Sequence, residues 1–307
     1  MKLKNIDRVL LFRTDRGVVL TFEELQTRYD IDPDGTNFYY GLNSQNLANF
    51  TQNGTALSQA HRAFFNAVLA SLQNSQDDEK TVVLGVEPPP TDSYRFVSEN
   101  LALVTELATE LADIQDQALS GGKRLNISIR YTSEMNAGDT PGWKDPAGYK
   151  STFVQARTVF AAAAPRILFS FSPALRADID ESKITQYWPG DQYVDIIGGT
   201  WYTGSDAQRK ASAATMRAYF LHRVGTGKPF ALSELGGCNP GPSPSQGVGN
   251  DEQLQGMLHE LEALQIQNIT FKYVTIFLDS KWGTDATLAF LGGGQPAVAS
   301  VATTSAN

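Results

Sequence analysis

Hydrophobic and polar positions along the chain change repeatedly between short β-type runs and longer stretches of helical spacing. Eight runs are rich in β-branched and aromatic residues and predict strands at residues 8–13, 37–42, 81–86, 125–131, 166–171, 193–198, 229–233 and 270–278. Two stretches between them carry apolar residues three and four positions apart, which is typical of amphipathic helices packed on a sheet. They contain Val97, Leu101, Val104, Leu107, Leu111 and Ile114 in one case, and Leu254, Met257, Leu258, Leu261 and Leu264 in the other.

Strict alternation of strands and helices implies parallel strands that are joined by helical crossovers. Eight such units close into a barrel, so we predict that residues 1–291 form a single (β/α)8 TIM barrel. A doubly wound open sheet is the alternative, and residues 8–22 could instead form a β-hairpin that turns at Asp15–Gly17. Residues 292–307 are small and polar, and we expect a flexible tail or linker there.

Composition and charge limit the classes of partner. The chain has 307 residues, of which 41% are hydrophobic and 19% charged, as expected of a globular protein with a large core. Its net charge of -8 and the lack of any long basic run argue against binding to nucleic acid or to an anionic membrane. We expect a monomer. The N-terminal residues lack the apolar run of about 7–15 residues that a secretory signal requires, so we expect export by another route or after signal removal.

Cysteine and histidine usage leaves the chemistry to carboxylates. Cys238 is the only cysteine, which excludes an intrachain disulfide. His61, His222 and His259 all fall in segments with helical spacing, away from the ends of the predicted strands. Neither a Ser-His-Asp triad nor a histidine zinc site is therefore favoured, and we expect no metal or organic cofactor.

Candidate catalytic residues follow the predicted strands, because the active site of such a barrel is built by the loops after the C-terminal strand ends. Glu134 and Glu234 end strands four and seven, which would place them face to face across the barrel mouth. A retaining glycosidase needs two carboxyls about 5–5.5 Å apart, and tyrosine and tryptophan suit the stacking and hydroxyl contacts of sugars. The other polar and aromatic residues near strand ends are Glu87, Asn136, Trp143, Trp201, Tyr202, Asp279 and Trp282.

Several motifs between Arg130 and Gly236 together resemble family 26 of the glycoside hydrolases, in clan A. The chain reads IRYTSEMNAGDTPGW, FSFSPAL, YWPGDQYVDIIGGTWY and KPFALSELG in that order. The pattern of that family has an arginine four residues before Glu-Met-Asn, then Trp-Ser-Pro, Tyr-Pro-Gly-Asp, and Lys-Pro before a glutamate. The matched stretch is about a third of the chain, and nothing upstream of Thr81 shows the resemblance.

The resemblance implies a retaining endo-glycoside hydrolase that cleaves a β-linked polysaccharide by double displacement, with Glu134 as acid/base and Glu234 as nucleophile. It also implies that Arg130 orients a carboxylate, that Tyr202 hydrogen-bonds the nucleophile, and that Trp282 forms a platform for a sugar. The remaining candidates for substrate contact are Asn136, Trp143, Trp201 and Asp279.

Two positions depart from that family. Ser133 replaces the histidine that usually precedes the acid/base, and Phe171 replaces the usual tryptophan of the fifth strand. Both changes put the mannan specificity that is common in the family in doubt and favour a bacterial exopolysaccharide, with hemicelluloses still open. Two other functions are compatible with the sequence, namely a transglycosylase that uses the same residues and a carbohydrate-binding barrel without turnover.

Overall fold

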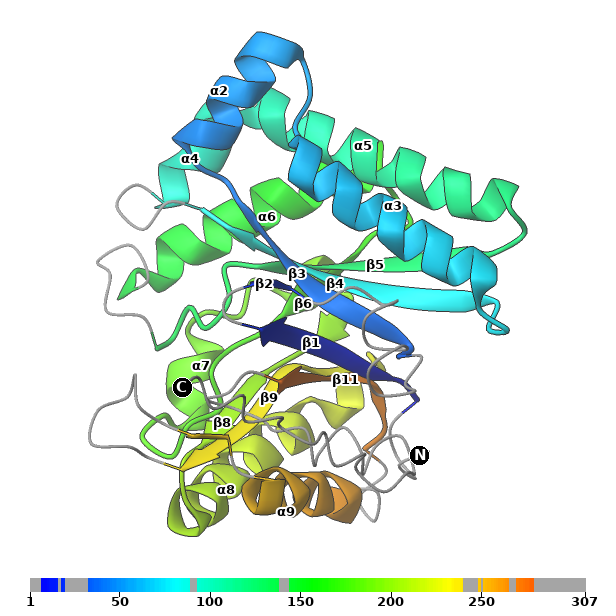
Figure 1. Ribbon diagram of the computed structural model, residues 1–307. Helices are drawn as coiled ribbons and strands as arrows, with labels where there is room; N and C mark the ends of the chain where they lie inside the picture. The colour runs from blue at the N-terminus through cyan, green and yellow to red at the C-terminus, as the bar shows by residue number, and fades with distance from the viewer. Residues whose placement is uncertain are drawn as a thin grey trace, which may run out of the picture.

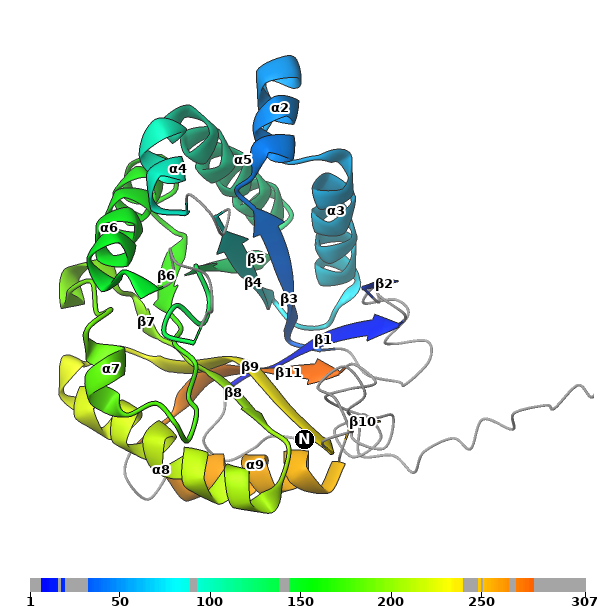
Figure 2. The same ribbon diagram turned by 90° about the vertical axis from the view of Figure 1, so that its left-hand side faces the viewer.

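The computed structural model describes residues 7–15, 18–19, 33–88, 93–137, 144–239, 248–249, 251–264 and 269–278. Eight parallel strand positions form a nearly closed barrel with helices outside it, which confirms the predicted (β/α)8 fold (Figures 1 and 2). In order around the barrel they are β1 (Val9–Asp15), β11 (Phe271–Leu278), β9 (Phe230–Asn239), β7 (Ile196–Ile197), β6 (Leu168–Phe171), β5 (Arg124–Tyr131), β4 (Glu79–Glu87) and β3 (Gly35–Gly41).

The barrel closes between β1 and β3 through a side chain. The Val9 N–H donates to Asp34 Oδ2 at 2.9 Å, and no ladder of backbone pairs joins these two strands among the described residues. The end of β1 also pairs antiparallel with β2 (Val18–Val19), where Thr14 faces Val19. The hairpin alternative is therefore correct locally, but the same strand runs parallel to β11 and belongs to the barrel.

The sixth strand differs from its predicted range of 193–198. Residues Asp191–Tyr193 form a 3₁₀ turn, and the extended chain consists of β7 followed by β8 (Thr200–Thr203), which pairs with β9. Gly198 and Gly199 separate the two pieces, and a Cβ on Gly198 would clash with the Ser170 hydroxyl. The break lets the chain approach β6 closely and then places β8 directly beside residues 234–237 of β9.

Eight helices are described around the barrel. They are α2 (Ser44–Asn53), α3 (Gln59–Asn74), α4 (Ser93–Glu99), α5 (Leu101–Ser120), α6 (Pro146–Ala163), α7 (Glu181–Thr185), α8 (Asp206–Arg223) and α9 (Asp251–Ala263). The predicted face on α9 is buried as expected. The apolar residues predicted to share one helix, from Val97 to Ile114, are divided between α4 and α5, because the backbone dihedral angles of Asn100 are not helical. Leu101 is 44% exposed and is not part of the buried face, contrary to the prediction.

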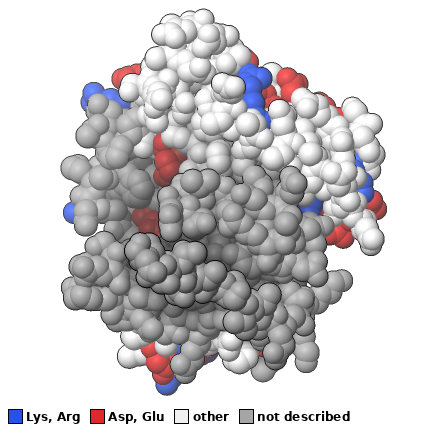
Figure 3. Space-filling model, viewed as in Figure 1, with Lys and Arg blue, Asp and Glu red and all other residues white. Residues whose placement is uncertain are grey.

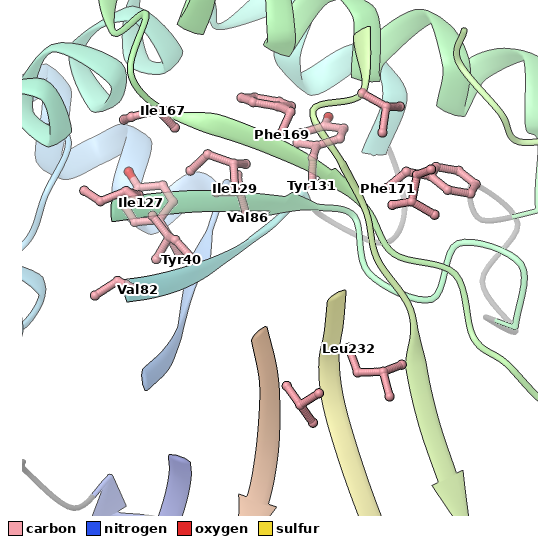
Figure 4. Close-up of a cluster of buried hydrophobic side chains, with 14 of the residues drawn as sticks. Tyr40, Val82, Val86, Ile127, Ile129, Tyr131, Ile167, Phe169, Phe171 and Leu232 are labelled. Atoms are coloured by element: carbon pink, nitrogen blue, oxygen red, sulfur yellow. The ribbon is translucent and has the colours of Figure 1, made fainter. Parts of the chain in front are cut away.

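The hydrophobic core lies mainly between the outer face of the strands and the helices. Figure 4 shows Ile127, Ile129 and Phe169 on neighbouring strands, gathered beneath the helical layer. Phe153 and Phe160 of α6 contact Phe169 edge to face, with ring centroids 5.6 and 5.2 Å apart. This packing fixes β5 and β6 and thereby the start of the loops that follow them.

The described surface has no broad charged region in the view of Figure 3, where acidic and basic side chains form small separate groups. Within the part of the chain that the structure describes, no helix combines the length and apolarity that a membrane span requires.

Candidate active site

A cavity of about 880 Å³ opens at the C-terminal ends of the strands. Both predicted carboxylates, Glu134 after β5 and Glu234 on β9, line this cavity. The other lining residues are Tyr39, Arg130, Ser133, Ala174, Arg176, Ala177, Asp178, Thr200, Tyr202, Gln208 and Ser212. The cavity therefore brings together carboxyl groups from β9 and from the loop after β5, two strands that β7 and β6 separate in the barrel.

Glu234 is held by donors from three different strands. Tyr202 on β8 donates its hydroxyl to Glu234 Oε2 at 2.7 Å, which is the contact that the resemblance implied. Tyr39 on β3 and Arg130 on β5 both contact the other oxygen, Oε1. Glu234 is only 5% exposed, and these contacts fix the orientation of its carboxyl group in the cavity wall.

Arg130 links the nucleophile candidate to its neighbours. The guanidinium also donates to Thr200 Oγ1 at 2.8 Å and to Tyr39 Oη at 3.2 Å, and the residue is fully buried. A buried charge without a partner is strongly destabilising, so the Arg130–Glu234 pair is one unit of the site. The sequence predicted that Arg130 orients a carboxylate, and the structure identifies this carboxylate as Glu234.

Burial dominates the electrostatics of Glu234. It raises the pKa of the carboxyl to about 8 from an ordinary value of 4.5, because a buried site disfavours the charged form. Arg130, Tyr39 and Tyr202 all donate to this group, and such hydrogen bonds stabilise the carboxylate over the acid. The charge of Glu234 thus depends directly on its three donors.

Glu134 has an unusual backbone conformation. Its φ is +52° and that of Thr132 is +50°, a left-handed region that non-glycine residues rarely adopt. The segment is fixed by backbone hydrogen bonds from Thr132 N to Val86 O at 3.0 Å and from Glu134 N to Ser172 O at 3.1 Å. Strained residues of this kind persist where the surrounding structure determines them and are concentrated at functional sites.

Trp201 is fully buried and does not line the cavity, which corrects the expectation that it contacts substrate, whereas substrate contact by Asn136, also absent from the lining, stays a prediction. The Asn136 amide donates to Ala174 O at 3.0 Å and accepts from Ala174 N at 2.8 Å, so it joins the loops after β5 and β6. Trp201 is fully buried, and its indole N–H donates to Ser212 Oγ at 2.8 Å. Both side chains therefore form hydrogen bonds with residues that line the cavity, Ala174 and Ser212.

Replacing Asn136 with alanine should lower the free energy of unfolding by about 1–3 kcal/mol, because the Ala174 N–H and carbonyl lose their partners. Thermal or denaturant unfolding measures this directly, and Asn136→Asp, which keeps the acceptor, should lose less. An unchanged stability together with a large rise in KM would instead mean that Asn136 binds substrate.

Three candidates lie outside the described residues, namely Trp143, Asp279 and Trp282, and their roles stay predictions. Tyr39 was not among the predicted site residues, which all lie at or after the ends of predicted strands. Alternate residues of a strand face opposite sides, and Tyr40 packs outward with its hydroxyl on Ala56 O, so Tyr39 faces the barrel interior. Among the described residues no group of three His, Cys, Asp or Glu side chains is arranged to hold a metal ion.

Comparison with known proteins finds solved structures that share this fold. No protein-family model matches the chain, and no curated protein matches it. Solved structures do match the chain. The chain is similar to a modular endo-β-1,4-mannanase from Cellulomonas fimi, with 16% identity and a TM-score of 0.62 over 88% of this chain and 64% of that one. It is also similar to a family 26 β-mannanase from Bacteroides ovatus, with 15% identity and a TM-score of 0.63 over 94% of this chain and 88% of that one.

A mannanase from Bacillus subtilis, BCman, has 14% identity and a TM-score of 0.56 over 92% of this chain and 85% of that one. The chain thus has a fold like that of the family 26 glycoside hydrolases, as its motifs indicated. It spans slightly less than two thirds of the Cellulomonas fimi enzyme.

Proposed function

We propose that this protein is a retaining endo-glycoside hydrolase that cleaves a β-linked polysaccharide, with Glu134 as acid/base and Glu234 as nucleophile. The observation that supports this most strongly is that both glutamates, Glu134 from the loop after β5 and Glu234 from β9, line one cavity. The fold shared with family 26 glycoside hydrolases supports the same class of reaction.

The proposed reaction is a double displacement. In the first step the Glu234 carboxylate attacks the anomeric carbon, while Glu134 gives its proton to the glycosidic oxygen that leaves. In the second step Glu134 takes a proton from water, which attacks the same carbon and releases Glu234. Both glutamates return to their starting protonation states and the atoms of one water molecule are added across the cleaved bond, so no cofactor is required.

The surroundings of the two glutamates suit these different roles. Glu234 is buried and held by Arg130, Tyr39 and Tyr202, which keep one oxygen in position for attack. Glu134 is half-buried and borders the cavity, where it can exchange a proton with a leaving group and then with water. A fixed carboxylate suits the nucleophile of a double displacement, and an accessible carboxyl suits the acid that later acts as base.

We propose a branched or substituted polymer, such as a bacterial exopolysaccharide, as the substrate in place of unsubstituted mannan. Ser133, which lines the cavity beside Glu134, is small, and its hydroxyl donates to Glu87 at 2.5 Å. That hydroxyl is therefore committed to the protein, and the space next to it is free for a larger or differently substituted sugar.

Reducing-sugar release across a panel of β-linked polysaccharides tests the proposed function. We expect kcat/KM to be highest on a substituted bacterial polymer and about 2- to 12-fold lower on β-mannan, the range that one lost hydrogen bond gives. Ser133→His should not improve the best activity. Mannan in first place would show that Ser133 does not change specificity, and no release from any polymer would reject the hydrolase itself.

The pH dependence follows from the raised pKa of Glu234. Only the ionised carboxylate attacks, so kcat/KM should rise with pH along an acid limb that lies above the ordinary 4.5, because burial raises the pKa of Glu234. Tyr202→Phe removes one donor to the carboxylate and should move this limb to still higher pH. A limb near pH 4.5 in the wild type, or one that Tyr202→Phe does not move, would contradict this assignment.

A further inference from the structure

We propose that Glu87, at the end of β4, is a positioning residue for the acid/base: it holds Ser133 and thereby fixes the strained segment that carries Glu134. This inference rests on the proposed function, because it assigns to Glu87 a role in the protonation step that Glu134 performs.

Two hydrogen bonds join Ser133 to one carboxylate oxygen of Glu87. Glu87 Oε1 accepts from Ser133 N at 3.1 Å and from Ser133 Oγ at 2.5 Å. The backbone pairing of β4 with β5 ends just before this point, with Val86 opposite Tyr131. The Glu87 side chain therefore supplies the acceptor for the loop where the strand no longer does.

The residue that Glu87 holds lies between the two strained residues. Thr132 and Glu134 have φ values of +50° and +52°, and Ser133 is the residue between them. A non-glycine segment stays in this region only when its surroundings fix it. Releasing Ser133 would let the backbone relax toward an ordinary conformation and would turn the Glu134 carboxyl away from its place in the cavity.

Glu87 occupies a site that is unfavourable for a carboxylate, which argues against a role in stability alone. Burial raises the pKa of the Glu87 carboxyl, while Arg130 and the hydrogen bonds from Ser133 lower it. Its second oxygen, Oε2, is buried and has no partner among the described residues. Glu87 is also absent from the cavity lining, so it acts through Ser133 and not on substrate.

The test compares leaving groups, because only the protonation step depends on them strongly. Aryl β-glycosides of the disaccharide released from the best polysaccharide serve as substrates, from dinitrophenyl to 4-methoxyphenyl. We compare kcat/KM, which reports the first step alone, because the second step also needs Glu134 as base. Glu87→Ala should lower kcat/KM about 100-fold on the methoxyphenyl substrate, the effect of an acid displaced by about 1 Å, and should leave kcat/KM on the dinitrophenyl substrate nearly unchanged. Glu87→Gln keeps an acceptor oxygen and should recover most of this loss.

Glu110→Ala is the matched control. Glu110 on α5 is also a buried glutamate outside the cavity lining that accepts a backbone N–H, from Leu57 at 2.7 Å, but its partners Leu57 and Arg62 are not on the segment that carries Glu134. This variant should lose stability without any change in leaving-group dependence. If Glu87→Ala does not fold, Ser133→Ala removes one of the two bonds and should show the same dependence to a smaller extent.

The outcomes distinguish a failure of the positioning role of Glu87 from a failure of the proposed function. An equal loss on all leaving groups, or no loss, in folded Glu87→Ala or Ser133→Ala would overturn the positioning role. Glu134→Ala must itself show the dependence, and if it does not, the proposed function fails before Glu87 is judged.

Discussion

Replacing Glu234 with alanine should abolish turnover, with kcat at least about 10⁴-fold lower on every substrate, as expected when a catalytic nucleophile is removed. Without the carboxylate no glycosyl-enzyme forms, and a good leaving group cannot compensate because it assists only departure. Steady-state kinetics on the polysaccharide and on a dinitrophenyl glycoside measure both losses. Azide should not restore the product with retained configuration.

Tyr202→Phe is the control for this variant, since it removes a donor to Glu234 but leaves the nucleophile in place. It should keep far more activity than Glu234→Ala. Arg130 loses its carboxylate in Glu234→Ala, so circular dichroism and thermal unfolding must show that the variant is folded. A folded Glu234→Ala enzyme that retains substantial turnover would place the nucleophile elsewhere.

Glu134→Ala should lower kcat on the polysaccharide by about 10²–10⁴-fold, the usual contribution of a general acid. Dinitrophenyl glycosides need little protonation, so the first step on them should be nearly normal. Azide needs no general base and should accelerate breakdown of the intermediate, giving a β-glycosyl azide. Azide rescue in Glu234→Ala, and not in Glu134→Ala, with retained configuration would mean that the two roles are exchanged.

The barrel was predictable because its strands are short β-branched runs that alternate with long amphipathic helices. The errors have local causes. The sixth strand was placed too early, since Gly198 and Gly199 look like a strand terminus while the chain continues as β8. Leu101 fits the helical spacing of its neighbours, but the helix breaks at Asn100, and periodicity alone carries no sign of such a break.

Sequence position predicted which strand ends meet at the cavity but not which way each side chain points. Glu134 and Glu234 both reach the cavity, whereas Trp201 and Tyr202 are consecutive on β8 and must face opposite sides. Tyr202 faces Glu234 and Trp201 is buried. Asn136 could not be assigned from the sequence, because its bonds to Ala174 join residues that are 38 positions apart.

The measurement that tests the central claim most directly is ¹H NMR of the anomeric proton in the first product released from the best β-linked polysaccharide. Double displacement through Glu234 predicts that the β-anomer appears first and the α-anomer only later, by mutarotation. If the α-anomer appears first, the reaction inverts configuration in a single step, and Glu234 is not a covalent nucleophile.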